Sequence, residues 1–385
     1  MELTKEEENA LKGEQGEAIA SAYRILLAIG EATEASKLVP IKWAHISGVN
    51  YNAIGDTGVQ FLENFSRDVK VVVKTTLNPM AFDRNKPGSI PENFIKKQMR
   101  IIKSYELMGT NPSFTCIPYE VFDVPEKESI VSFAESNAAI FSNSMLGLLT
   151  NKESGLSALA SSVTGKASYS DLRVEEFRHP KATIRPDIKL VTELDYGLLG
   201  YFAGKVVNNS CVAFDRIIEK PDIIKAKALS AAIGTSGSCG MFILEEKTEE
   251  EIIPFGKEEA NAIRDELNTA DDGNLITLGS PQLGMNELNL IANLVESKKF
   301  TRRCIIFCAR AIHNQAAKVG LVDKIEQAGG EFVCDSCTCF TPLVTRREFD
   351  SVITNSIKGA YYLKHSNKVG VALKDLKTII KEYSN

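Results

Sequence analysis

Strand-like and helix-like segments alternate along most of this chain, and that alternation limits its fold more than any other feature. In the second half, strands are expected at 182–192, 210–215, 239–245, 273–279, 303–308, 331–335 and 350–354, and helices at 196–206, 222–233, 256–268, 284–297, 309–319, 356–363 and 372–382. Such alternation is typical of α/β layers with mostly parallel sheets.

The first half follows the same pattern. Thr4 and Glu7 form a capping-box pattern in front of a long helix that ends near Gly30. Strands are expected at 38–46, 69–77 and 112–116, and a helix at 56–65. Because 385 residues exceed one ordinary core, we expect two or three packed subdomains. We divide the chain into three α/β subdomains around a cleft. Their expected bounds are 1–150, 151–270 and 271–385.

Composition and charge exclude several classes of protein. The net charge is −5 and no block of Lys and Arg occurs, so nothing favours nucleic acid as a partner. No apolar run approaches the roughly 20 residues of a membrane helix, so no membrane partner is expected. The acidic start differs from a signal peptide, and eight cysteines are too few for a disulfide scaffold. A cytoplasmic location is therefore expected.

Polar side chains follow the expected strands at six places. Ligands of parallel α/β sheets gather at the carboxyl ends of strands, so these side chains are candidates for one cleft. They include His45 and Ser47, Thr76 and Asn78, Cys116, Ser280, the run from Cys334 to Cys339, and Thr354 with Ser356. The alternative stays open at each place, because Ser, Thr and Asn after a strand also cap the next helix. For His45 the alternative is a hydrogen-bonded interior histidine.

The cysteines around 334–339 give a metal signal of intermediate strength. The run Cys334-Asp-Ser-Cys337-Thr-Cys339 contains a C-x-x-C spacing, which supplies half of a tetrahedral site. Cys116 follows a strand among polar residues and suits a ligand. The other cysteines are interpreted as buried structural residues because their surroundings are apolar: Cys211, Cys239, Cys304 and Cys308. A structural zinc site is a further alternative, without an identified fourth ligand.

Common catalytic signatures are absent. The sequence has no G-x-x-x-x-G-K-[ST] and no H-E-x-x-H. The stretch from Gly234 to Gly240 lacks the G-x-G-x-x-G spacing of a dinucleotide site. Four scattered histidines do not define a hydrolase triad.

Short motifs along the whole chain resemble the large subunit of the aconitase X family. They are Gly48-Val-Asn-Tyr51, Ile54-Gly-Asp56, Thr75-Thr-Leu-Asn-Pro79, Thr115-Cys-Ile-Pro-Tyr119, Glu135-Ser136, Ser142-Asn-Ser144 with Gly147, Thr150-Asn151, Asp335-Ser-Cys337 and Thr354-Asn-Ser356. The resemblance implies an aconitase-like core of layered α/β/α subdomains that lacks the mobile fourth, or swivel, domain. In such families that domain is often a separate small subunit, which supplies a catalytic serine.

The resemblance also implies an activity. Family members dehydrate small hydroxy acids, either mevalonate 5-phosphate or cis-3-hydroxy-L-proline, with an iron–sulfur cluster as Lewis acid. This chain is thus expected to be a hydro-lyase with a small swivel subunit as partner and a hydroxy acid as substrate. The family's three cluster cysteines match Cys116, Ser280 and Cys337. The residues expected to bind substrate are His45, Ser47, Thr76, Asn78, Glu135, Asn143, Ser144, Thr354, Ser356 and Lys358.

Departures from the family pattern fall in the expected site. Ser280 stands where a cysteine is expected, and Leu149 stands where the family has an arginine suited to carboxylate or phosphate. Two expected histidines are also missing, one of them at Leu244. Two hypotheses follow: a dehydratase with a changed metal centre, whether cluster or mononuclear iron, or a non-catalytic, ligand-binding paralogue that keeps the fold. A serine is a harder and poorer cluster ligand than a thiolate. The thiols of Cys334 and Cys339, which flank Cys337, are alternative candidates to complete a different site with Cys116.

Overall fold

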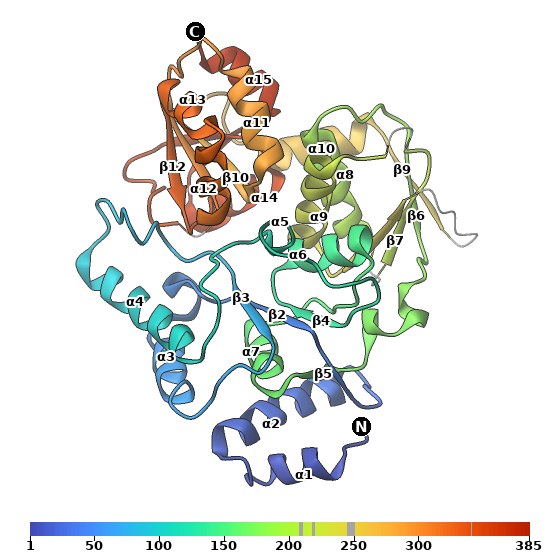
Figure 1. The fold of residues 1–385 in the computed structure, drawn as a ribbon. Helices are drawn as coiled ribbons and strands as arrows, with labels where there is room; N and C mark the ends of the chain where they lie inside the picture. The colour runs from blue at the N-terminus through green and yellow to red at the C-terminus, as the bar shows by residue number, and fades with distance from the viewer. Residues whose placement is uncertain (208–210, 218–219, 245–250, 340) are drawn as a thin grey trace.

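The computed structural model describes residues 1–207, 211–217, 220–244, 251–339 and 341–385. Three parallel sheets, each with its own helices, meet around the short helices α5 (Pro118–Val121) and α6 (Ser136–Phe141) (Figure 1). A two-stranded antiparallel sheet joins β1 (Leu38–Pro40) to β5 (Lys166–Ser168). The predicted α/β class with mostly parallel sheets is confirmed.

The N-terminal sheet has the strand order β3-β2-β4. Its strands are β2 (Trp43–Ile46), β3 (Lys74–Leu77) and β4 (Val131–Phe133), and its helices are α1 (Lys5–Leu11), α2 (Glu17–Ala32), α3 (Tyr51–Phe65), α4 (Glu92–Leu107) and α7 (Gly155–Thr164). Every residue of β2 and β4 is buried, as in parallel sheets covered on both faces. The capping box at Thr4 and Glu7 is present, but it starts the short helix α1, and the expected long helix is divided in two.

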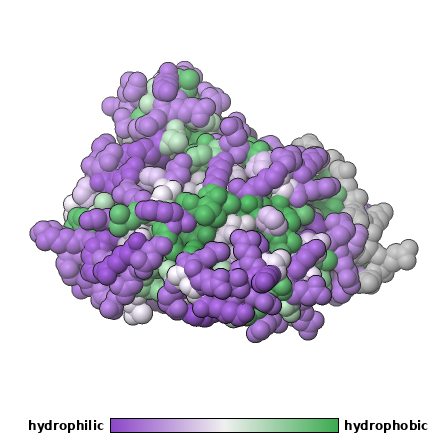
Figure 2. Space-filling model, turned by 60° about the horizontal axis from the view of Figure 1, so that its bottom comes forward, coloured by the Kyte–Doolittle hydropathy of each residue, from purple (hydrophilic) through white to green (hydrophobic). Residues whose placement is uncertain are grey.

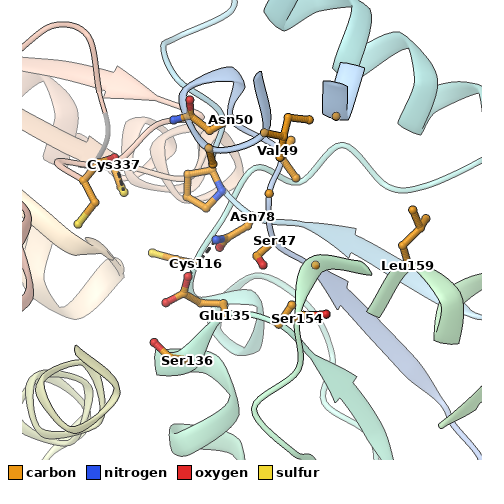
Figure 3. Close-up of a pocket in the computed structure, with 18 of the residues that line it drawn as sticks. Ser47, Val49, Asn50, Asn78, Cys116, Glu135, Ser136, Ser154, Leu159 and Cys337 are labelled. Atoms are coloured by element: carbon orange, nitrogen blue, oxygen red, sulfur yellow. Dashed lines mark hydrogen bonds between the residues drawn. The ribbon is translucent and has the colours of Figure 1, made fainter. Parts of the chain in front are cut away.

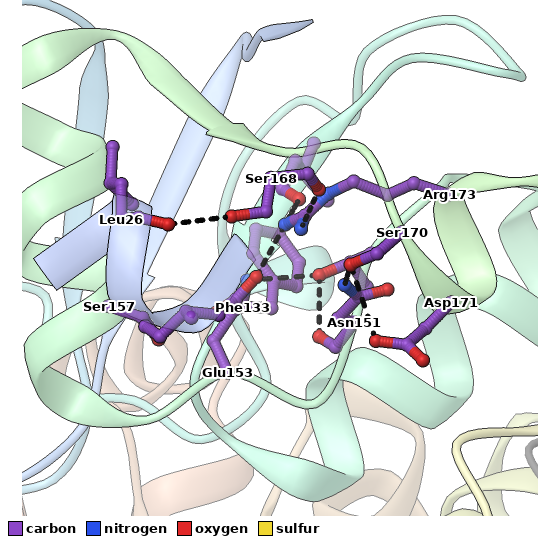
Figure 4. Close-up of polar contacts among 12 residues, drawn as sticks. Leu26, Phe133, Asn151, Glu153, Ser157, Ser168, Ser170, Asp171 and Arg173 are labelled. Atoms are coloured by element: carbon purple, nitrogen blue, oxygen red, sulfur yellow. Dashed lines mark hydrogen bonds and ion pairs between the residues drawn. The ribbon is translucent and has the colours of Figure 1, made fainter. Parts of the chain in front are cut away.

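Residues 151–173 pack against the N-terminal sheet and its helices (Figure 4). Helix α7 packs against β2 and α2. The fully buried guanidinium of Arg173 donates to the carbonyls of Val131 and Ser168 and pairs with Glu153 at 2.6 Å. The Ser168 hydroxyl donates to the carbonyl of Leu26 in α2. Residues 151–173, which the expected division assigns to the middle subdomain, therefore pack with the first one.

The middle sheet has the order β8-β7-β6-β9. Its elements are β6 (Thr183–Pro186), α8 (Glu193–Val206), β7 (Cys211–Phe214), α9 (Ile223–Ser236), β8 (Met241–Leu244), β9 (Ile252–Phe255) and α10 (Lys257–Leu267). Helices α8 and α9 approach closely because glycines lie between them. A Cβ atom on Gly237 would stand 1.8 Å from the carbonyl oxygen of Gly204.

The C-terminal sheet is the largest, with the order β12-β11-β10-β13-β14. Its elements are β10 (Leu275–Leu283), α11 (Met285–Leu294), β11 (Arg303–Cys308), α12 (Arg310–Lys318), α13 (Leu321–Gln327), β12 (Gly330–Cys334), β13 (Ser351–Thr354), α14 (Ile357–Tyr362), β14 (Gly370–Leu373) and α15 (Leu376–Tyr383). Cys304 and Cys308 are buried in β11, in agreement with the structural role expected for them.

Two predicted strands are wrong in part or in whole. Only 74–77 of the expected strand 69–77 pairs in a sheet, because the N–H groups of Val71 and Val72 donate to the carbonyls of Met108 and Ser162. The expected strand 112–116 is not a strand, and one isolated bridge joins Asn111 to Thr76 beside it.

Three further boundaries differ from the prediction. Pro40 ends β1, and β2 begins at Trp43 in another sheet, so the expected strand 38–46 is two strands. The expected helix 372–382 begins at Leu376, and Gly370–Leu373 before it forms β14. The short elements β9 and α13 lack a distinct sequence pattern and were not predicted.

The surface seen from below the view of Figure 1 is mostly hydrophilic, with hydrophobic residues gathered in a band across its middle (Figure 2). No helix in the described ranges is long and apolar enough to cross a membrane.

Candidate active site

A cavity of about 510 Å³ lies where the N-terminal and C-terminal sheets face each other (Figure 3). Its described lining comes from residues 47–159 and 280–362, and none comes from the middle sheet. The predicted residues that line it are Ser47, Asn78, Cys116, Glu135, Ser280, Cys337 and Lys358. They follow strands or lie within one, with one exception: Ser47, Asn78, Glu135, Cys337 and Lys358 follow β2, β3, β4, β12 and β13, and Ser280 lies within β10. Cys116 also lines the cavity, although the segment 112–116 is not a strand.

One end of the cavity holds a buried ion pair. The Lys358 ammonium, from the first turn of α14, pairs with the carboxylate of Glu135, and both side chains are 10% exposed. Asn78 donates to the other carboxylate oxygen at 2.9 Å, and Glu135 also accepts from the N–H of Asn137 as the N-cap of α6. These three donors fix the carboxylate in place.

The electrostatics keep both members of this pair ionised. Burial disfavours the charged form of Glu135, but the charge and hydrogen bond of Lys358, with Asn78, hold the Glu135 pKa below its usual range. Burial likewise disfavours the ammonium, yet the Glu135 charge raises the pKa of Lys358 well above its usual value. Lys358 is the one basic side chain among the described residues of the cavity wall.

Three thiols stand on the same wall. They belong to Cys116, Cys337 and Cys339; Figure 3 shows Cys116 beside Asn78 and Glu135, and Cys337 on the side of the C-terminal sheet. The N–H of Gln282 donates to the Cys116 sulfur at 3.2 Å. Burial raises the pKa of Cys116 to about 12.

Cys337 and Cys339 interact as a pair. The hydrogen bond between their thiols raises the pKa of Cys337, with burial adding to the effect. Burial also opposes ionisation of Cys339, but the bond to Cys337 and the charge of Lys358 leave its pKa below the usual value. The Ser280 hydroxyl lies 3.0 Å from the Cys339 sulfur.

The opposite end of the cavity is apolar. Its wall is formed by side chains of α3 and α7: Ala53, Ile54, Phe61, Leu62, Leu156 and Leu159. Leu156 is 51% exposed and lies at the solvent side. A ligand in this cavity would therefore meet charge and thiols at one end and hydrocarbon at the other.

The remaining predicted residues do not line the cavity. His45 and Thr76 are buried in the N-terminal sheet, where His45 Nδ1 lies 2.8 Å from Thr76 Oγ1. Burial lowers the pKa of His45 to about 4, so its ring is neutral. Thr76 also accepts from the indole of Trp43. His45 is thus a hydrogen-bonded interior histidine, which was the alternative to a role in the cleft.

The other predicted polar residues form hydrogen bonds with backbone groups and do not line the cavity. Asn143 donates to the carbonyls of Thr150 and Gly240, and Ser144 accepts from the N–H of Phe242. Ser356 caps α14 and donates to the carbonyl of Ser280, while the Thr354 hydroxyl accepts from the N–H of Ser356.

Sequence reasoning did not select several residues of the wall. Asn50 and Ser154 cap helices α3 and α7, and Tyr362 ends α14. A cap signal alone does not distinguish a cavity wall from any helix start, so no sequence signal identifies them. Cys339, by contrast, belongs to the run from Cys334 to Cys339 that the sequence singled out as a metal candidate.

Comparisons with known proteins agree with this geometry. Three family profiles match successive parts of the chain: aconitase X first domain at residues 1–176, second domain at 180–273 and third domain at 273–385. A crystal structure titled Thermococcus kodakaraensis aconitase X (holo-form) matches with a TM-score of 0.91 and 33% identity, covering 100% of both chains.

Characterised relatives carry dehydratase names. The phosphomevalonate dehydratase large subunit of Methanocaldococcus jannaschii is 37% identical over 99% of this chain and 100% of its own length. The cis-3-hydroxy-L-proline dehydratase of Pseudomonas aeruginosa is 30% identical over 91% of this chain, but over only 64% of its own length.

Fold, cavity and relatives together define an enzyme class, the hydro-lyases that dehydrate their substrate. Within that class, the chain belongs to the aconitase X family.

Proposed function

We propose that this chain is the large subunit of a cytoplasmic two-subunit enzyme that dehydrates a small hydroxy acid with the help of an iron–sulfur cluster. The observation that carries the proposal is the joint presence of three thiols and the Glu135–Lys358 pair on one cavity wall. Cys116, Cys304, Cys308, Cys334, Cys337 and Cys339 form no disulfide among the residues that the structure describes, which suits a reducing compartment.

The donor set fits an iron–sulfur cluster better than a single metal ion. Among the described residues, no three His, Cys, Asp or Glu side chains are grouped to hold one ion. Thiolates that hold a cluster bind separate iron atoms. They therefore need to line the same cavity but do not need to converge on a single ion. Three cysteines on the wall meet that requirement. When bound, iron would act as a Lewis acid toward the hydroxyl that leaves.

The residues of this chain would bind and orient the substrate. A substrate carboxylate is attracted by Lys358, whose ammonium can donate to it as well as to Glu135. Asn78 and Ser47 offer short polar groups beside this position. The apolar end, with Phe61 and Leu159, excludes water from the rest of the substrate.

The names of the relatives support a separate small subunit, which in this proposal supplies the catalytic serine. The large subunits named among the relatives are covered by 92–100%. The cis-3-hydroxy-L-proline dehydratases are covered over only 65% and 64% of their own length, so each has a part that lies outside the match.

The substrate has two candidates. Full-length similarity to phosphomevalonate dehydratase large subunits favours mevalonate 5-phosphate. The cavity favours an acid without phosphate, such as cis-3-hydroxy-L-proline, because Lys358 is the sole basic group on its described wall and is already paired with Glu135.

The test is an anaerobic dehydration assay of the chain produced together with its small subunit, with each acid supplied in turn. Mass spectrometry would detect the loss of water from the substrate. The proposal expects turnover of one acid, and no turnover by the Lys358→Met variant. If the loaded pair of subunits dehydrates neither acid, the ligand-binding paralogue is the correct interpretation.

A further inference from the structure

The cavity wall separates the eight cysteines into two groups. Five are buried away from it, in strands or against the hydrophobic cores: Cys211, Cys239, Cys304, Cys308 and Cys334. The other three line the cavity, namely Cys116, Cys337 and Cys339. The residue at position 280 also lines it but offers a hydroxyl, which is a harder donor than sulfur.

Cys339 occupies the space beside residue 280. Its sulfur lies 3.0 Å from the Ser280 hydroxyl oxygen, and both side chains are buried. A sulfur atom at position 280 would be larger than this oxygen and would crowd the sulfur already there. There is therefore space for a thiol at position 280 or at position 339, but not at both. In this chain the thiol is at residue 339.

We propose that the third thiolate of the cluster site is Cys339, with Cys116 and Cys337, and that Ser280 is not a ligand. Ser280 is then a positioning residue whose hydroxyl donates to the Cys339 sulfur. This inference deepens the proposed function and rests on its iron–sulfur cluster. Hydrogen bonds to a thiolate sulfur alter the reduction potential of a cluster. The Ser280 contact should therefore change the electronic properties of the cluster more than the amount of cluster bound.

The loop that carries Cys337 and Cys339 is held firmly in place. Arg310 donates to the buried carboxylate of Asp335 at 2.8 Å and pairs with Asp83, which accepts from the N–H of Cys334. On the other side, the amide of Gln282 donates to the carbonyl of Ser336 at 2.7 Å. Such support preorganises a ligand loop before the cluster binds.

The experiment compares single variants of the full chain after anaerobic reconstitution with iron and sulfide. The variants are Cys337→Ala, Cys339→Ala, Ser280→Ala and, as the matched control, Cys334→Ala at the end of β12, directly before the loop. Iron and sulfide per chain and the EPR spectrum are the readouts, and circular dichroism of each apo variant shows whether it folds. We expect Cys339→Ala and Cys337→Ala to lose most bound iron and sulfide. Ser280→Ala and Cys334→Ala should keep the wild-type content, and Ser280→Ala alone should shift the EPR spectrum.

A double variant keeps the proposal falsifiable if Cys339→Ala does not fold. Ser280→Cys combined with Cys339→Ala moves the thiol across the 3.0 Å contact and should restore iron and sulfide. A folded double variant without them would overturn the proposal, as would full content in Cys339→Ala or loss of content in Ser280→Ala. A wild-type chain that binds no cluster would instead refute the proposed function itself.

Discussion

Replacing Lys358 by methionine should destabilise the protein strongly, because it leaves the buried Glu135 carboxylate without its positively charged partner. The two side chains are only 10% exposed, so the pair is not screened as a surface pair is. Removing one partner of a buried ion pair costs about 3–5 kcal/mol, and the lower end applies here since Asn78 and the N–H of Asn137 still donate to the carboxylate.

The loss should depend on pH in a defined direction. Lys358 holds the pKa of Glu135 below its usual range, and without that charge burial raises it. The folded variant then binds a proton more readily than the unfolded chain does. Its stability relative to the wild type should therefore recover as the pH falls toward 5 and worsen toward pH 8.

Urea unfolding followed by tryptophan fluorescence measures this effect. The only tryptophan, Trp43, is 1% exposed and lies in β2, next to the strand that leads to Glu135. The double variant Lys358→Met with Glu135→Gln removes both charges and should be more stable than Lys358→Met alone. A loss below about 1 kcal/mol in the single variant would refute the reasoning, because that is the value of an exposed pair. Additive losses in the double variant would refute it too.

Three further predictions concern the scaffold. The pKa of His45 is about 4 in the folded protein and 6.5 in the unfolded chain, so the free energy of unfolding should fall by about 3 kcal/mol between pH 7 and pH 4. In urea titrations, the His45→Gln variant should lack this decrease of about 3 kcal/mol. Gly237→Ala should cost about 3 kcal/mol or fail to fold, since its Cβ would meet the Gly204 carbonyl; a wild-type melting temperature would contradict this. Arg310→Ala should cost about 2 kcal/mol and speed amide exchange in the loop from Asp335 onward; unchanged exchange would count against it.

The sequence predicted the fold where strands are long and buried, and failed where pairing is decided by distant residues. The segment 303–308 is apolar after Arg303 and forms β11, and residues 351–354 of the expected strand 350–354 form β13. The run 69–77 reads equally well, but the N–H of Val72 is taken by Ser162 of α7, a partner about ninety residues away. The end of β14 falls inside the helix expected at 372–382, so that strand was not predicted.

The site was predictable to the level of strand ends and motifs. That reasoning selected Cys116, Asn78 and Lys358, which line the cavity. It did not distinguish a side chain that faces the cavity from one that turns back into the fold, as Asn143 does toward Gly240. In the cysteine loop, the choice between Ser280 and Cys339 depends on a contact between residues 59 positions apart, which spacing alone cannot reveal.

Diffraction at the iron absorption edge, from crystals grown anaerobically with iron and sulfide, tests the central claim most directly. The account predicts anomalous density in the cavity, bounded by the sulfurs of Cys116, Cys337 and Cys339 and close to Lys358. A cavity without iron in such crystals, or iron bound only elsewhere on the chain, would contradict it.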